Sequence, residues 1–165
     1  MKFDLKDNKM ANVTALLILR HFYPEDLSEI KRLENLAFTV GPYSRRMLRK
    51  IFSSPGAFNV IAEEEKRIMG YAVAMPMEQG VFDIESIAVH PDSQKKGIGA
   101  ILLFEIEKQM KQMGGKVSIL EVRDKNECAI KFYKDHGYEI TGHLDNYYSL
   151  KHKESRGAYR MAKNL

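Results

Sequence analysis

The sequence predicts a single domain of α/β (α+β) class, and three observations lead to that prediction. Short apolar runs typical of strands alternate with stretches in which apolar residues recur at helical spacing. Glycine and proline residues separate these stretches and mark turns. The chain has 165 residues, of which 44% are hydrophobic and 29% charged, and this composition is that of a globular domain with a substantial core.

The N-terminal part of the chain predicts one strand followed by two helices. Residues 1–12 are polar and aperiodic, so we expect a flexible extension there. The unbroken apolar run at 13–20 predicts a buried strand. Pro24 stands where a helix would begin, and apolar residues follow at helical spacing as far as Ala37. A second, shorter helix is expected over 44–52.

The middle of the chain changes to strands. Residues 57–62 and 68–75 flank a charged tip, which predicts a hairpin. A turn is expected at 76–80, and 81–89 then forms the third strand of an antiparallel meander.

Two helices and further strands complete the predicted domain. One helix begins after Gly97, carries an apolar face that ends with Met113, and is stopped by Gly114. Asn126 is a plausible cap for a second helix, which Gly137 ends. The remaining strands are expected at 117–122, 138–144 and 158–162.

A polar, glycine-bearing loop at 94–99 follows the strand that His-Pro ends. Its backbone N–H groups would point outward at the positive end of a helix dipole, where phosphate binds well. Gly97 and Gly99 permit close approach of a ligand, and Lys95 and Lys96 add positive charge. The loop lacks the spacing of a Walker loop and the third glycine of a dinucleotide-binding loop. An ordinary solvated turn is the alternative reading of the loop alone.

The run Gln-Lys-Lys-Gly-Ile-Gly at 94–99 resembles the Gln/Arg-x-x-Gly-x-Gly/Ala signature of the GNAT acyltransferase superfamily. A second block at 120–138, Leu-Glu-Val-Arg-x-x-Asn-x-x-Ala-Ile-x-x-Tyr-x-x-x-Gly-Tyr, is most similar to N-terminal amine acetyltransferases of the ribosomal-protein alanine and archaeal N-alpha types. The resemblance spans 13–165 and implies a GNAT domain, a mixed sheet of about seven strands flanked by about four helices. It also implies that the strands bearing Val89 and Val122 splay apart to admit the cofactor.

The resemblance implies acetyl-CoA as the cofactor and CoA as a product. The backbone N–H groups of Ile87 and Val89 would meet the acetyl carbonyl and the pantetheine arm. Asn126 matches a pantetheine contact, with helix capping as its alternative role. The residues expected to contact the cofactor are Ile87, Ala88, Val89, Gln94, Lys95, Lys96, Gly97, Ile98, Gly99, Ala100, Asn126 and Tyr133.

Amine attack on a thioester needs an unprotonated amine, so a carboxylate that accepts a proton is expected. Glu121 is our first candidate, because it lies in an otherwise apolar strand and matches the glutamate that related enzymes use. A structural ion pair with Arg123 or a lysine is the alternative. Glu85 is the rival base, at the position of the base in histone-acetylating relatives. Asp83 shares its strand parity, where some relatives have histidine, and Glu34 is a third option.

The leaving thiolate needs a proton, and the acceptor needs a slot. The resemblance implies that Tyr133 is the general acid, and a phenol with a pKa of about 10 is protonated at neutral pH. An ordinary core tyrosine with a satisfied hydroxyl is the alternative. Phe38, Val40 and Tyr147, which Tyr148 follows, match loops that line the peptide slot in related enzymes.

Composition limits the partners and the compartment. A net charge of +4 suits a polyanion such as CoA, but lysines interleaved with acids argue against nucleic-acid binding. No stretch approaches membrane-spanning length. The single cysteine, Cys128, is expected to be a buried helix residue, excludes an internal disulfide, and fits the cytoplasm. We expect no metal, and a monomer or weak dimer.

The resemblance implies an acetyl-CoA-dependent N-alpha-acetyltransferase that acts on the N-terminal amine of proteins or peptides. An α-amino group suits a modest base, since deprotonating it at neutral pH costs about 3–4 kcal/mol less than deprotonating lysine. Acetylation of a small amine or of lysine is the alternative, favoured if Glu85 is the base. A catalytically silent acyl-CoA-sensing module is the non-enzymatic alternative.

Overall fold

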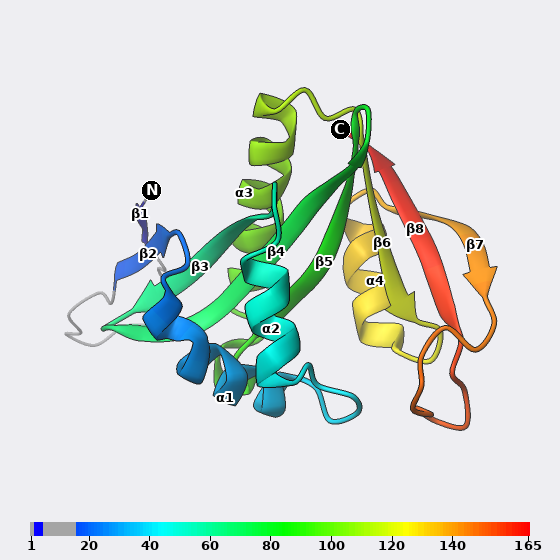
Figure 1. Ribbon diagram of the computed structural model, residues 1–165, viewed down its shortest axis with the longest axis horizontal. Coiled ribbons are helices and arrows are strands. Elements are labelled where there is room, and N and C mark those ends of the chain that lie inside the picture. Colours follow the sequence, from blue (N-terminus) through cyan, green and yellow to red (C-terminus); the bar gives the residue numbers. More distant parts are fainter. Residues whose placement is uncertain (1, 5–15) are drawn as a thin grey trace.

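The computed structural model describes residues 2–4 and 16–165 and shows one mixed sheet with helices on both faces (Figure 1). The described chain forms eight strands in the order β1-β2-β3-β4-β5-β6-β8-β7. The strands are β1 (Lys2–Asp4), β2 (Leu16–Arg20), β3 (Phe58–Glu64), β4 (Arg67–Glu78), β5 (Val81–Val89), β6 (Val117–Arg123), β7 (Glu139–Leu144) and β8 (Ala158–Asn164). The helices are α1 (Leu27–Ala37), α2 (Arg45–Phe52), α3 (Ile98–Gln112) and α4 (Glu127–Asp135), with short 3-10 helices η1 (Pro24–Asp26) and η2 (Pro91–Ser93).

The expected fold class, a mixed sheet flanked by helices, is confirmed. The additional strand is β1, which pairs with β2 and lies in the segment 1–12 that we expected to be flexible. The rest of that segment, and the start of the strand expected at 13–20, lie outside the described residues.

Each face of the sheet carries its own core. On one face α3 buries Leu102 and Ile106 completely against β3, β4 and β5, and α4 packs against the same core. On the other face α1 and α2 bury Ile30 and Leu48 against a second cluster that contains Tyr71 of β4. The sheet therefore separates an α3/α4 side from an α1/α2 side.

Strands β5 and β6 are paired for only a short distance. Their parallel pairing joins residues 81–83 to 117–119. Beyond this point β5 remains paired with β4, and β6 with β8, while Figure 1 shows β5 and β6 separating from each other. The expected parting of these two strands is therefore confirmed. We call the region between their diverging ends, beyond Asp83 and Ile119, the strand gap.

Three local expectations are wrong. The turn expected at 76–80 is shorter, because β4 continues to Glu78 through Pro76, where its register with β5 shifts. Such an irregularity admits a proline, which cannot donate to the ladder. Met113 caps the end of α3 and is half exposed, and Cys128 is exposed on α4 and not buried.

In the described chain no helix has the length and apolar character needed to cross a membrane.

Candidate active site

Backbone amides of β5 line the gap between β5 and β6. The N–H of His90 donates to the carbonyl of Met69 in β4, at 2.7 Å. Successive residues of a strand direct their N–H groups to opposite edges. The N–H groups of Ile87 and Val89 therefore point away from β4 and into the gap, whereas that of Ala88 points toward β4.

The loop after β5 presents unpaired amides at the start of α3. Gly97 has φ +84° and Lys95 has φ +60°, so the loop takes left-handed backbone at two positions. The first helical hydrogen bond of α3 is accepted by the carbonyl of Gly97. The N–H groups of Ile98, Gly99 and Ala100 consequently have no acceptor within the helix.

The space in front of this loop is open. A Cβ built on Gly97 would meet no atom within 4 Å, and one on Gly99 would lie 3.5 Å from the ring of Phe132 in α4. The side chain of Gln94 ties the loop to the strand end by donating to the carbonyl of Val89 at 3.2 Å, and Lys96 is exposed. Outward amides, a glycine cradle and lysines at a helix N-terminus fit a diphosphate.

Acidic side chains occupy the α1/α2 side of the gap. Their strand neighbours pack into the core beneath α3, namely Phe82, Ile84, Leu120 and Val122. Asp83 of β5 and Glu121 of β6 therefore project from the opposite face. A register shift between β4 and β5 leaves Glu85 between the pairs that flank it, and its carboxylate reaches the α1–α2 loop on the same side.

Two of the three carboxylates have strong partners. The guanidinium of Arg160, cross-strand on β8, contacts Oε1 of Glu121 through both Nε and Nη2 at 2.7 Å. The ion pair considered for Glu121 therefore exists, but with Arg160 and not with Arg123. Glu85 accepts a hydrogen bond from the hydroxyl of Tyr43 at 2.8 Å.

Asp83 differs from both. Its Oδ1 is the only buried side-chain oxygen or nitrogen in the described residues that has no hydrogen-bond partner. Burial, and then the nearby charges of Glu121 and Glu85, raise its pKa to about 7, although Arg160 acts in the opposite direction. Sequence reasoning placed Asp83 on the correct side of its strand but could not show this isolation.

Glu34 is a buried carboxylate of α1 that holds a loop next to the site. It is 2% exposed, and it accepts hydrogen bonds from the Tyr71 hydroxyl and from the backbone N–H of Tyr43. Burial raises its pKa, although these two hydrogen bonds oppose the rise. Glu34 thus anchors the loop that carries Tyr43, and its role as a third candidate base stays a prediction.

Tyr133 lies on the other side of the sheet from the carboxylates. Its ring meets those of Phe132 and Tyr138 edge to face and packs against the α3-side core. Burial raises the pKa of its hydroxyl, so the group stays protonated at neutral pH. Asn126 caps α4, with its side-chain oxygen accepting from the N–H of Ala129 at 3.2 Å. The capping role is therefore present, and the amide NH₂ remains for a ligand.

Two loops cover the acidic side of the gap. Phe38 and Val40 are half-buried on the α1–α2 loop, and Tyr147 is 49% exposed on the β7–β8 loop. The two loops meet at Arg123 of β6. Its guanidinium lies 3.9 Å from the ring centroid of Tyr148, and a Cβ on Gly41 would be 3.1 Å from it.

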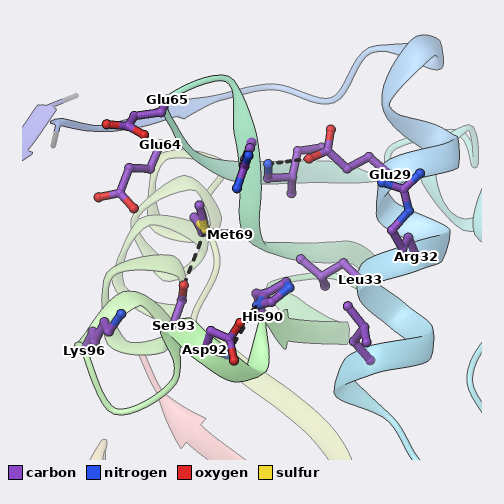
Figure 2. A pocket seen from close by; sticks show the side chains of 13 residues that line it. Glu29, Arg32, Leu33, Glu64, Glu65, Met69, His90, Asp92, Ser93 and Lys96 are labelled. Atoms are coloured by element: carbon purple, nitrogen blue, oxygen red, sulfur yellow. Dashed lines mark hydrogen bonds and ion pairs between the residues drawn. The ribbon is translucent and has the colours of Figure 1, made fainter.

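A separate cavity of about 600 Å³ lies between α1, the β3–β4 hairpin tip and the η2 turn (Figure 2). Its titratable lining residues are Glu29, Glu64, Glu65, Asp92, Arg32, Arg67, Lys96 and His90. Acidic and basic groups are nearly balanced, so this wall does not select a ligand by charge. Asp83, Glu85 and Glu121 do not line it, and we place the reaction at the strand gap.

The family profile described as Acetyltransferase (GNAT) family matches residues 25–138. This chain belongs to the GNAT acetyltransferase family. It is 33% identical over 134 residues to an uncharacterized N-acetyltransferase of Methanocaldococcus jannaschii, a match that covers 80% of this chain and 84% of the relative. It is also 34% identical over 82 residues to the ribosomal protein bS18-alanine N-acetyltransferase of Escherichia coli, covering 48% of this chain and 55% of that enzyme.

Solved structures share the fold. The crystal structure of the Escherichia coli ribosomal-protein-S18-alanine N-acetyltransferase matches with a TM-score of 0.81 and 23% identity, over 90% of this chain and 94% of that one. Arabidopsis thaliana Naa50, in complex with a bisubstrate analogue that joins CoA to a peptide, matches with a TM-score of 0.77 and 24% identity, over 90% and 99%.

The chain is accordingly an acetyltransferase, and GNAT acetyltransferases use acetyl-CoA. The open Gly97 cradle and the outward amides fit the diphosphate of that cofactor. The expected family resemblance, enzyme class and cofactor are thus confirmed, while the roles of individual residues stay predictions.

Proposed function

We propose that this GNAT enzyme transfers the acetyl group to the N-terminal amine of proteins or peptides. The observation that carries this proposal is the acceptor side of the gap. There, three carboxylates project beneath two loops that carry Phe38, Val40 and Tyr147. Acidic groups next to apolar and aromatic side chains suit an extended chain end that carries an amine. The bS18-alanine enzyme and the Naa50 complex with a CoA–peptide analogue support the same substrate class.

In the proposed mechanism, residues on the two sides of the sheet have different roles. The amides at 97–100 hold the diphosphate, and those of Ile87 and Val89 hold and polarise the acyl carbonyl. Bound acetyl-CoA supplies the activated thioester. A carboxylate on the α1/α2 side takes the proton of the amine, and Tyr133 on the α4 side holds the proton that the thiolate needs.

A peptide panel tests the proposed acceptor. Peptides that differ at the first residue are incubated with enzyme and acetyl-CoA, each with a free and with a blocked N-terminus. We expect acetylation of free N-termini only, located by fragmentation mass spectrometry. Acetylation that survives on blocked peptides would instead indicate lysine as the acceptor. Tight CoA binding with no acetylated peptide would indicate a small amine, or a sensing role without turnover.

Replacing Tyr133 with phenylalanine should lower kcat and leave acetyl-CoA affinity almost unchanged. The variant keeps the ring that packs against Phe132 and Tyr138 and removes only the hydroxyl. Loss of a general acid typically lowers the rate by about 10²–10⁴-fold. Steady-state kinetics and calorimetry with CoA measure the two quantities, and an unchanged kcat would remove Tyr133 from the mechanism.

A further inference from the structure

We propose that Asp83, and not Glu121 or Glu85, accepts the proton of the attacking amine. The proposal rests on the proposed use of an amine acceptor at the strand gap, and it names the residue that serves this acceptor. It depends on where the carboxylate stands, on what its neighbours are bonded to, and on the charges that face it.

Asp83 stands at the point where the two strands part. It forms the last pair of the β5–β6 ladder, with Ile119. Its side chain projects to the α1/α2 side, because its neighbours Phe82 and Ile84 pack into the opposite core. An amine that approaches between the diverging strands, beneath the α1–α2 and β7–β8 loops, would meet Asp83 where the paired segment ends.

The rival carboxylates are already engaged. Glu121 is held by two contacts from Arg160 at 2.7 Å, so its Oε1 already accepts both N–H donors of one guanidinium edge. Glu85 accepts a hydrogen bond from the hydroxyl of Tyr43. Asp83 keeps a buried oxygen for which the described chain offers no donor.

The groups that face Asp83 come from four elements. Glu85 lies on its own strand, Glu121 on β6, Arg160 on β8 and Tyr147 on the β7–β8 loop. The two carboxylates outweigh the one guanidinium, and together with burial they bring the pKa of Asp83 to about 7. A base with a pKa near the working pH combines the required ionisation with sufficient basicity.

The proposed step balances as follows. The amine nitrogen forms a bond to the acyl carbon while its proton passes to the carboxylate of Asp83, directly or through one water molecule. The carbon–sulfur bond breaks, and the thiolate takes the proton of the Tyr133 hydroxyl. Solvent then removes the proton from Asp83 and returns one to Tyr133, so neither residue is consumed.

The decisive experiment compares Asp83→Asn with Glu121→Gln and Glu85→Gln, each of which removes one carboxylate at nearly constant volume. The acceptor is whichever amine the wild-type enzyme acetylates, so the test remains valid if that amine is not a peptide N-terminus. We expect Asp83→Asn to lower kcat/KM at pH 7 by about 10²–10⁴-fold and to leave CoA affinity unchanged. The two glutamine variants should lose distinctly less.

The pH profile separates proton transfer from a structural role. Below pH 7 both the amine and Asp83 must lose a proton, so log kcat/KM of the wild type should rise with a slope that approaches two. In Asp83→Asn the slope should fall to one, because only the amine still titrates. Three results would overturn the proposal. The kcat/KM of Asp83→Asn at pH 7 could stay within threefold of wild type, or its log kcat/KM could keep a slope near two below pH 7. Alternatively, the slope could fall to one in Glu121→Gln and not in Asp83→Asn.

Discussion

Replacing Gly97 with valine should reduce CoA affinity by about 100-fold or more. Gly97 has φ +84°, a conformation that costs a residue with a Cβ about 1–3 kcal/mol. The space beside it is open, with no atom within 4 Å of a built Cβ, so the added side chain would stand where we place the diphosphate. Isothermal titration calorimetry with CoA measures the loss directly.

Gly114 offers a matched control at the other end of the same helix. It has φ +81°, and a Cβ there also meets nothing within 4 Å. Gly114→Val should therefore lose thermal stability to a similar extent while CoA affinity stays at the wild-type value. Equal CoA affinity in Gly97→Val, Gly114→Val and wild type would show that the diphosphate is held elsewhere.

Local sequence signals predicted those parts of the fold that depend on neighbouring residues. The third meander strand was expected at 81–89 and is observed with those bounds, because a turn precedes it and a His-Pro pair ends it. The cap by Asn126 was also readable, since capping is a contact within one helical turn. The end of β4 was misplaced, because an irregular register across two strands admits Pro76 and no local pattern records it.

The candidate site depends on contacts between distant residues, and these limit sequence reasoning. An apolar strand correctly indicated that Glu121 is largely buried and needs a partner, but the partner lies 39 residues away on β8. Its identity follows from the β6–β8 register. The lack of a hydrogen-bond partner for Oδ1 of Asp83 is even harder to predict from the sequence. It arises because Arg160 and Tyr43 bond to the other two carboxylates and not to Asp83.

The second large effect expected is a gain of stability at alkaline pH when Asp83 is replaced with asparagine. In the native state Asp83 has a pKa of about 7, against an ordinary value of 3.8. Between these two pH values the native state holds a proton that the unfolded state has released, so stability falls as pH rises. The slope is about 1.4 kcal/mol per pH unit, and the total approaches about 2–4 kcal/mol above pH 7.

Asparagine has the same shape and no charge, so it should escape this loss. Urea unfolding at pH 8 should show Asp83→Asn to be more stable than wild type, with the difference shrinking as pH falls toward 4.5. Asp135→Asn, which removes an exposed carboxylate that pairs with Lys131, controls for general charge effects and should change stability little at any pH. Parallel stability curves for wild type and Asp83→Asn would show that Asp83 titrates in the ordinary range. That result would also count against Asp83 as the proton acceptor.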